Sequence, residues 1–299
     1  MPHTLVGLIG AGLQRSLTPL MHEAEGRVLG LDYEYRLLDL DVLGRTAADL
    51  PELLATAEAE GYRAVNVTHP CKQAVVPLLD ALDPGAARIG AVNLVLFRNG
   101  RRIGYNTDET GFRIAVERSL GSVAGQHVVQ FGAGGAGSAI AHALVGLGVR
   151  RLDVVDADLG RTEALVATLE PPTDSPVDAR VLTMTDADDV LATADGAVNA
   201  TPLGMNDDPR QAFDPALLPR GAWVSDAVYF PLETPLVRSA RAAGFRVVDG
   251  GWMAVGQAVA SLRHITGLEP DLGRVRAAFT GFLAERRTAG DRTGREAIG

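Results

Sequence analysis

The stretch that decides the fold reads Gln126-His-Val-Val-Gln-Phe131-Gly132-Ala-Gly134-Gly-Ala-Gly137-Ser138. Its apolar start predicts a strand over 126–131, and residues 138–147 predict an apolar helix. The glycines between them match G-x-G-x-x-G, in which the first permits a tight turn, the second lets the backbone approach a pyrophosphate, and the third allows close helix–strand packing. A turn without a ligand is the alternative, but free N–H groups at a helix start favour phosphate. The expected dinucleotide site comprises Gly132, Gly134, Gly135, Ala136 and Gly137.

The end of the next expected strand, 152–155, favours NAD over NADP. The sequence continues there as Asp156-Ala157-Asp158-Leu-Gly-Arg161. An acid about 20 residues after the glycine loop can accept hydrogen bonds from ribose hydroxyls, whereas it would repel a 2′-phosphate. Arg161 is the nearby cation that could meet such a phosphate, and the alternative is that it pairs with an aspartate on the surface. We therefore expect Asp156, Asp158 and Arg161 at the cofactor, and NAD as that cofactor.

Outward from this region, short apolar runs alternate with helical patterns, which predicts an α/β fold with a mostly parallel sheet. Asn99-Gly100 marks a hairpin in the first part of the chain, because both turn positions tolerate positive φ. The predicted division is an N-terminal α/β domain over 1–115, a Rossmann-type dinucleotide-binding domain over 116–249, helices within 250–284 that pack back on the first domain, and a disordered tail over 285–299.

The composition excludes several classes of protein. The 299 residues carry 28 basic and 37 acidic side chains, a net charge of −9 that argues against nucleic-acid binding. The one cysteine cannot form an internal disulfide, and no Cys/His cluster has the spacing of a metal site. The first ten residues do not resemble a secretory leader, and no apolar run is long enough to span a membrane. A cytoplasmic protein without metal is expected, either a monomer or a homodimer.

Lys72 is the single lysine among the 28 basic residues. A codon bias toward arginine explains most of this skew, and chance survival of one lysine is the alternative. An arginine stays protonated at any working pH, whereas an amine can exchange its proton with a substrate. The count therefore points to Lys72 as a candidate for proton transfer.

Four polar clusters in the first domain follow or end expected strands, where a cleft forms in an α/β fold. They read Ser16-Leu-Thr18-Pro19, Asn66-Val-Thr68-His-Pro-Cys-Lys72, Gly90-Ala-Val-Asn93 and Asn106-Thr-Asp108. The glycine loop follows them, and then come Asn199-Ala-Thr201-Pro-Leu-Gly-Met205, Asp226, Tyr229 and Gly256-Gln257-Ala258. This ordered set resembles the shikimate dehydrogenase family, and the resemblance covers about residues 5–283.

The resemblance implies a two-domain enzyme that holds its substrate between the domains. It would transfer hydride between a nicotinamide ring and C3 of a cyclohexene or cyclohexane polyol carboxylate. Lys72 and Asp108 would be the catalytic pair at the C3 oxygen, because an amine can take the alcohol proton in one direction and return it in the other. The other implied roles are carboxylate binding for Ser16 and Thr18, a place near the carboxylate for Tyr229, ring-hydroxyl binding for Thr68, Asn93 and Gln257, and cofactor contact for Asn199, Thr201, Met205 and Gly250.

Departures from the family pattern bear on the substrate. Thr18 stands in place of a serine, His69 in place of the usual apolar residue, and Ala157 where NADP-dependent members place an arginine. Together they resemble the NAD-dependent quinate/shikimate branch. Quinate has a C1 hydroxyl next to its carboxylate, which Thr18 could meet. The alternatives are a biosynthetic, NADP-tolerant shikimate dehydrogenase, a dehydrogenase of an amino-substituted analogue, and a non-catalytic dinucleotide or metabolite sensor on the same fold.

Each polar cluster also has a purely structural interpretation. Ser16, Thr18 and Asp108 are good helix caps, and Asn93 and Asn106 are common turn residues. The turn that begins at Asn199 could simply end a strand. The order of the whole set favours the functional interpretation over these.

Overall fold

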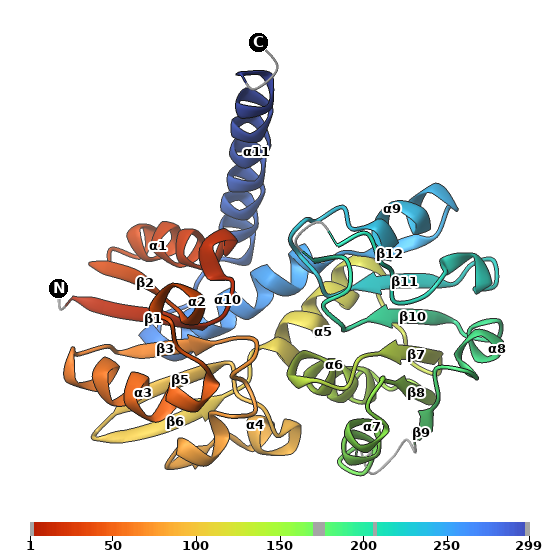
Figure 1. Cartoon of the computed structure of the whole chain (residues 1–299), viewed down its shortest axis with the longest axis horizontal. Coiled ribbons are helices and arrows are strands. Elements are labelled where there is room, and N and C mark those ends of the chain that lie inside the picture. The colour runs from red at the N-terminus through yellow and green to blue at the C-terminus, as the bar shows by residue number, and fades with distance from the viewer. Residues whose placement is uncertain (1–2, 170–176, 206–207, 297–299) are drawn as a thin grey trace.

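The computed structural model describes residues 3–169, 177–205 and 208–296, with side chains as far as 285. Its strands form two six-stranded sheets that lie side by side (Figure 1). The first sheet has the order β2-β1-β3-β5-β6-β4 and is mixed, because β5 runs antiparallel to both β3 and β6. Its strands are β1 (Thr4–Gly10), β2 (Tyr33–Asp39), β3 (Ala64–Val67), β4 (Ala81–Leu82), β5 (Leu94–Arg98) and β6 (Arg101–Tyr105).

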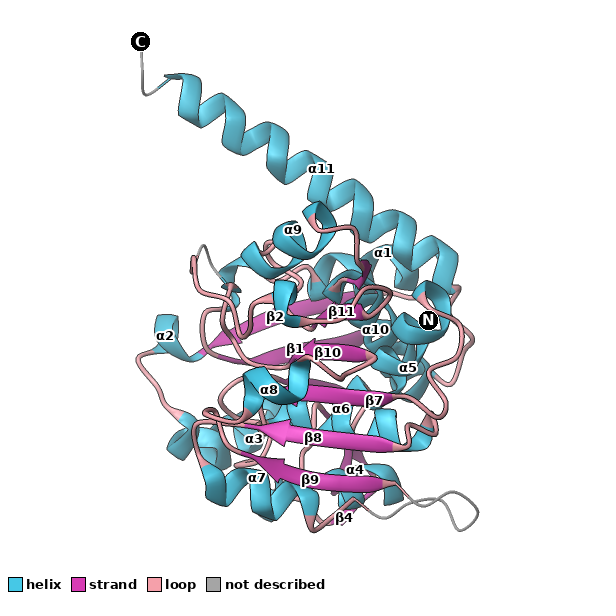
Figure 2. Ribbon diagram, turned by 90° about the vertical axis from the view of Figure 1, so that its right-hand side faces the viewer, coloured by secondary structure: helices cyan, strands magenta, loops and turns pink. Residues whose placement is uncertain are grey.

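The second sheet has the order β12-β11-β10-β7-β8-β9. All its neighbours pair in parallel, as the arrows of β8 and β9 show in Figure 2. Its strands are β7 (His127–Phe131), β8 (Arg151–Val155), β9 (Asp178–Leu182), β10 (Gly196–Asn199), β11 (Trp223–Asp226) and β12 (Arg246–Val248). β7, β10 and β11 are buried along their whole length, as helices on both faces of a parallel sheet require. The predicted α/β class is confirmed, with the Rossmann-like sheet entirely parallel.

Helices cover both sheets and join them. Those of the first half are α1 (Thr18–Val28), α2 (Leu40–Leu43), α3 (Leu50–Ala59) and α4 (Pro84–Ile89); those of the second are α6 (Gly135–Gly146), α7 (Leu159–Val166), α8 (Ala187–Leu191) and α9 (Pro235–Ala242). α5 (Asp108–Ser119) and α10 (Gly250–Thr266) lie against each other between the sheets, and α11 (Leu272–Glu296) extends outward (Figure 1). Among the described residues, no helix is both long and apolar enough to cross a membrane.

Two features of the structure bear on the predicted domain limits. The limit between residues 115 and 116 falls inside α5, so a continuous helix joins the two sheets. α10 and α11 both contact α1, as expected of helices that return to the first half. The domain limits themselves stay a prediction.

The backbone of α11 continues to Glu296, past residue 285 where the disordered tail was expected to begin; 297–299 lie outside the described residues, and disorder of the tail stays a prediction. One local prediction fails. Neither Ser16 nor Thr18 is the N-cap of α1: that position is Leu17, and Thr18 is already helical. The hairpin prediction is confirmed, since Asn99 and Gly100 have φ of 54° and 68°.

Candidate active site

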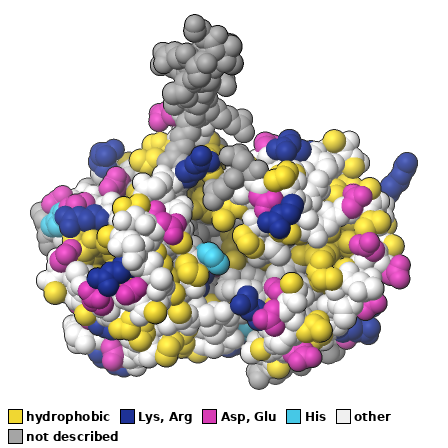
Figure 3. All heavy atoms as spheres, viewed as in Figure 1, with side chains coloured by type: hydrophobic (Ala, Val, Ile, Leu, Met, Phe, Trp, Pro, Cys, Tyr) yellow, Lys and Arg dark blue, Asp and Glu magenta, His cyan; other side chains and the backbone are white. Residues whose placement is uncertain are grey.

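The candidate residues lie at the carboxyl ends of parallel strands in both sheets. In the first sheet, the loops after β1 and β3 carry Ser16 and Lys72; in the second, the loops after β7, β8 and β10 carry the glycines, Asp156 and Thr201. Ligands bind at this edge in open α/β sheets. The space-filling view shows the surface hollowed between the two halves of the molecule (Figure 3).

Lys72, Asp108 and Asn93 form one connected group. Lys72 Nζ donates to Asp108 Oδ2 at 2.5 Å, and the two side chains are 16% and 7% exposed. Asn93 Nδ2 donates to the other carboxylate oxygen at 3.0 Å. Asp108 is therefore held from two sides rather than capping α5, whose N-cap is Thr107. A partly buried amine with a fixed carboxylate neighbour can give up and take back a proton at a defined place.

Behind this group lies a buried hydrogen-bond chain that sequence reasoning missed. Thr107 Oγ1 accepts from Asn93 Nδ2 at 2.9 Å and lies 3.1 Å from Ser261 Oγ on α10. Ser261 Oγ accepts from Asn66 Nδ2 at 3.1 Å, and Tyr35 Oη donates to Asn66 Oδ1 at 2.9 Å. The chain ties β2, β3 and α10 to the helix start that carries Asp108. Its partners are up to 195 residues apart, so no local pattern in the sequence marks them.

Both amide hydrogens of Asn93 are used inside the protein. One is donated to Asp108 and the other to Thr107, while Asn93 Oδ1 accepts the Thr107 N–H at 2.8 Å. The side chain is buried. In this arrangement Asn93 acts on the site through Asp108, and its binding of a ring hydroxyl stays a prediction.

The loop that carries Ser16 is held by Asp39 at the end of β2. Asp39 Oδ2 accepts the Leu13 N–H at 2.9 Å and Gln14 Nε2 at 3.0 Å. Burial would raise the pKa of Asp39, but these hydrogen bonds and one from the Asp41 N–H outweigh it and lower the pKa below its ordinary value. Ser16 Oγ accepts the Thr18 N–H at 3.3 Å, which links the end of this loop to the first residue of α1.

The remaining predicted substrate residues come from three other elements. Thr68 follows β3 and its methyl group packs against Gly10. Gln257 lies on α10 beside Gly111, and Gly111 is one helical turn after Asp108 on α5. Tyr229, which follows β11, packs on a cluster formed by residues of α10, α11, Leu17 and Met21. None of these positions tests the predicted contacts with a substrate.

The glycine loop has the geometry that a pyrophosphate needs. Gly132 has φ of 107°, and a Cβ there would lie 2.8 Å from the Ala200 backbone; at Gly137 a Cβ would lie 2.1 Å from the Gly132 carbonyl oxygen. At Gly134 a Cβ would meet nothing within 4 Å. No group in the described part of the chain accepts the N–H groups of residues 135–137. Free donors beside an open backbone surface fit a dinucleotide phosphate.

Two acids follow β8, one beside the glycine loop and one at the start of α7. Asp156 Oδ2 accepts the Ala133 N–H at 2.7 Å, which places this carboxylate beside the glycine loop. Asp158 caps α7 and lies 3.2 Å from Arg161 Nε, both side chains being well exposed. Arg161 therefore pairs with Asp158 at the surface of the protein.

The turn after β10 is built around Asn199. Its Nδ2 donates to Asp226 Oδ1 and to the Leu203 carbonyl, and its Oδ1 accepts from the Thr201 N–H and hydroxyl. Asn199 is fully buried and shapes the turn that carries Thr201, while Met205 beyond it is 40% exposed.

Gly250, the first residue of α10, lies against the loop after β11. A Cβ there would lie 2.6 Å from the Val228 carbonyl oxygen. Contact of Gly250 with a cofactor stays a prediction.

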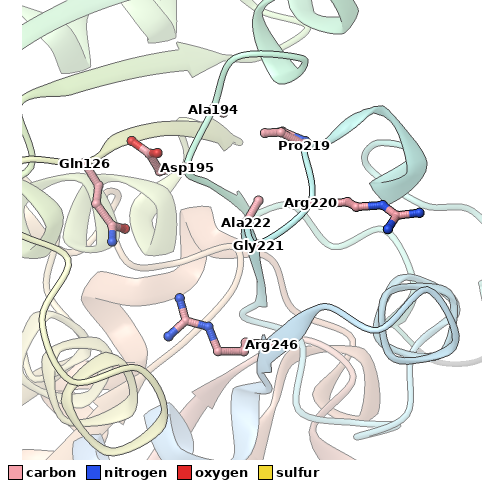
Figure 4. A pocket seen from close by; sticks show the side chains of 8 residues that line it. All are labelled: Gln126, Ala194, Asp195, Pro219, Arg220, Gly221, Ala222 and Arg246. Carbon is pink, nitrogen blue, oxygen red and sulfur yellow. The ribbon is translucent and has the colours of Figure 1, made fainter.

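A second hollow lies at the opposite edge of the parallel sheet. Figure 4 shows it at the amino ends of β7, β10, β11 and β12, with the side chains of Arg220 and Arg246 extending in different directions. It is lined by Gln126, Ala194, Asp195, Pro219, Arg220, Gly221, Ala222 and Arg246. It shares no residue with the candidate site. Within the described ranges, no three His, Cys, Asp or Glu residues gather as metal ligands.

Comparisons with known proteins agree on one family. A model of the shikimate dehydrogenase substrate binding domain matches residues 8–95. The shikimate dehydrogenase (NADP(+)) of Arthrobacter sp. (strain FB24) is 49% identical over 94% of this chain and 95% of its own length. The quinate/shikimate dehydrogenase (NAD(+)) of Corynebacterium glutamicum (strain R) is 46% identical over 92% of this chain and 97% of its own.

Among solved structures, the quinate dehydrogenase from Corynebacterium glutamicum in complex with NAD superposes with a TM-score of 0.84 at 45% identity. The match covers 93% of this chain and 99% of that one. Identity at this level over nearly the whole length, with a superposable fold, means that the chain belongs to the shikimate dehydrogenase family.

Proposed function

We propose that this member of the shikimate dehydrogenase family is an NAD-dependent enzyme. It oxidises the C3 hydroxyl of quinate, and of shikimate, to the 3-dehydro ketone in a reversible hydride transfer. The observation that carries the proposal is the 2.5 Å contact of Lys72 Nζ with Asp108 beside the glycine loop. A sensor would need the binding residues but no such proton-transfer pair.

In this proposal Lys72 is the acid–base group at the C3 oxygen. Oxidation removes a hydride from C3 and a proton from its hydroxyl, and the bound nicotinamide supplies the hydride acceptor. The amine of Lys72 takes the hydroxyl proton and returns it in the reverse direction. Asp108 fixes the direction of that amine, and Asn93 and the buried chain behind it fix Asp108.

The polar side chains around the pair suit a polyol carboxylate. Ser16 and Thr18 hold the carboxylate from the loop that Asp39 anchors, with Tyr229 near it. Thr68 and Gln257 meet ring hydroxyls, whereas Asn93, with its amide hydrogens donated to Thr107 and Asp108, acts on the site through Asp108. A ring that leaves such buried polar groups unmatched binds less well, which gives the site its selectivity.

The charges after β8 support NAD. Asp156 lies at the glycine loop, Asp158 follows it, and Arg161 is paired with Asp158. A 2′-phosphate would meet two carboxylates and no unpaired cation of this segment, which disfavours NADP. An NADP-dependent shikimate dehydrogenase is the second candidate, and the relative at 49% identity that bears that name favours it.

Initial rates of NAD⁺ and NADP⁺ reduction, each with quinate and with shikimate, test the assignment. Fast reduction of NAD⁺ with quinate is the expected result. A preference for NADP⁺ with shikimate would overturn both the cofactor and the substrate, and would favour the second candidate.

Two variants test the roles of the residues. Lys72→Ala should still bind substrate and cofactor but lose hydride transfer, and surviving activity would show that Lys72 is not the acid–base group. Thr18→Ser should move the preference from quinate toward shikimate. An unchanged ratio of kcat/KM values would remove Thr18 from the account of specificity.

A further inference from the structure

The dinucleotide fingerprint does not explain why residue 135 is a glycine. The pattern requires glycine at 132, 134 and 137 and allows any residue between them. Gly135 is the first residue of α6, and its φ lies outside the left-handed region that favours glycine. The backbone conformation at 135 would therefore accept alanine, which is the better helix former. A contact with another segment can account for the glycine.

That contact is with Lys72. A Cβ at position 135 would lie 3.1 Å from Lys72 Cβ, 3.4 Å from Lys72 Cδ and 3.6 Å from Ala91 Cβ. The first distance is shorter than ordinary van der Waals contact, and the second is at its lower limit. The missing side chain of Gly135 is thus replaced by the stem of the lysine.

The lysine has little freedom to retreat from an added methyl group. Its carbonyl oxygen accepts the Val92 N–H at 2.8 Å, which holds the backbone below Cβ. Its Nζ is held by Asp108 at 2.5 Å, which fixes the other end of the side chain. A methyl group at 135 would therefore move Lys72 or push the two halves of the protein apart.

The first turn of α6 is attached to the first half at the same place. Ser138 Oγ donates to the Ile89 carbonyl at 2.6 Å, and Ala139 packs with Ile89 and Ala91 in a small buried cluster. Small residues at 135, 138 and 139 thus allow close approach on one face of the helix. The helix that would hold the cofactor phosphates rests directly on the segment that carries Lys72.

We propose that Gly135 is a positioning residue that sets the separation between the cofactor loop and Lys72. Gly135 touches the stem of the lysine. Through this contact, the position of the nicotinamide and the position of the proton acceptor Lys72 depend on each other. The inference rests on the proposed role of Lys72 and adds Gly135 to the residues on which catalysis depends.

Gly135→Ala tests it. We expect kcat to fall about tenfold, because a displacement of several tenths of an ångström at the reacting groups is costly. The primary deuterium isotope effect on kcat with C3-deuterated substrate should rise, and the pH at which kcat is half-maximal should move. The NAD Kd from calorimetry should change by less than about threefold, and Tm should not fall, because alanine favours the helix.

Two matched glycine variants separate this effect from others. Gly134→Ala, one residue earlier, adds a methyl group that meets no protein atom, so it should weaken NAD binding and leave the isotope effect unchanged. Gly281→Ala, on the exposed part of α11, should leave all kinetic constants unchanged.

The outcomes distinguish the two proposals. If Gly135→Ala keeps the wild-type kcat, isotope effect and pH profile, Gly135 has no positioning role. If its loss of kcat comes with an equal loss of NAD affinity or with a lower Tm, the contact acts on cofactor binding or folding instead. If Lys72→Ala remains active, the role of the lysine fails first, whatever Gly135→Ala does.

Discussion

Asp226 makes the folding stability of this protein depend on pH in a direction opposite to that of most carboxyl groups. It ends β11 and is 1% exposed. Its oxygens accept from Asn199 Nδ2 and the Val228 N–H, both at 3.0 Å, and from the Thr234 hydroxyl at 2.6 Å. Burial raises the pKa of Asp226 to about 6, although these hydrogen bonds act to lower it.

The magnitude follows from the two pKa values. A shift from 3.8 to about 6 corresponds to about 3 kcal/mol. Between these pH values the unfolded chain has released the proton and the folded protein still holds it. The folded state therefore binds more protons there, and the free energy of unfolding falls as pH rises from about 4 to 6 and is then constant. Above pH 6 this carboxylate destabilises the protein by that full amount.

Urea unfolding of wild type and Asp226→Asn at half-unit steps from pH 4 to 7.5 measures the effect. Asparagine keeps the shape but cannot ionise. The stability of wild type relative to the variant should fall by about 3 kcal/mol over this range, and taking the difference removes the contribution of every other carboxyl group. Thr234→Val should make the fall larger, because it removes a hydrogen bond that lowers the pKa of Asp226.

The reasoning fails if the wild-type and Asp226→Asn stabilities run parallel from pH 4 to 7.5. Asp226 would then keep the pKa of an exposed carboxyl despite its burial. A difference that grows in favour of wild type with rising pH would show that its hydrogen bonds outweigh its desolvation.

Two further changes probe the framework of the site. Asp39→Asn places an amide N–H against the donors of Leu13 and Gln14 or of Asp41, so the free energy of unfolding should fall by about 1–3 kcal/mol. In steady-state assays KM for the polyol should rise more than KM for the cofactor, and equal rises would contradict this. Ser261→Ala leaves one hydrogen of the buried Asn66 amide without an acceptor, so the free energy of unfolding in urea should fall by about 1–3 kcal/mol. If the fall is as small as that of an exposed serine-to-alanine control on α5, a water replaces the hydroxyl.

The glycine loop could be predicted from sequence because the elements that define it are close together in the chain. Strand, loop and helix follow one another within 20 residues, and a Cβ at Gly132 or Gly137 would meet backbone of the turn after β10 or of the glycine loop itself. The hairpin at Asn99 is local in the same sense. The meeting of Lys72 with Asp108, 36 residues later, came from the family resemblance rather than from the residues themselves.

The parts that were missed depend on contacts between distant segments. Thr107, Ser261 and Asn66 are small polar residues with no periodic signal, and only the packing of α10 on the first sheet gives them partners. Asp39 carries no signal of its own in the sequence, and its role appears only when β2 lies beside β1. Asn93 was expected to face a ligand, but its amide hydrogens are used by the protein.

The path of α10 has a consequence for how the protein is made. This helix follows β12, the last strand of the second sheet, yet it supplies Ser261 to the first sheet and packs on α1 and α5. While the chain leaves the ribosome, residues 3–119 must wait for about 140 more before Asn66 and Thr107 find Ser261. All strands of the first sheet lie within residues 4–105, so they emerge first but lack α10, whereas the segment 127–248 holds every strand of the second sheet. We expect the first half to need protection from aggregation until α10 emerges.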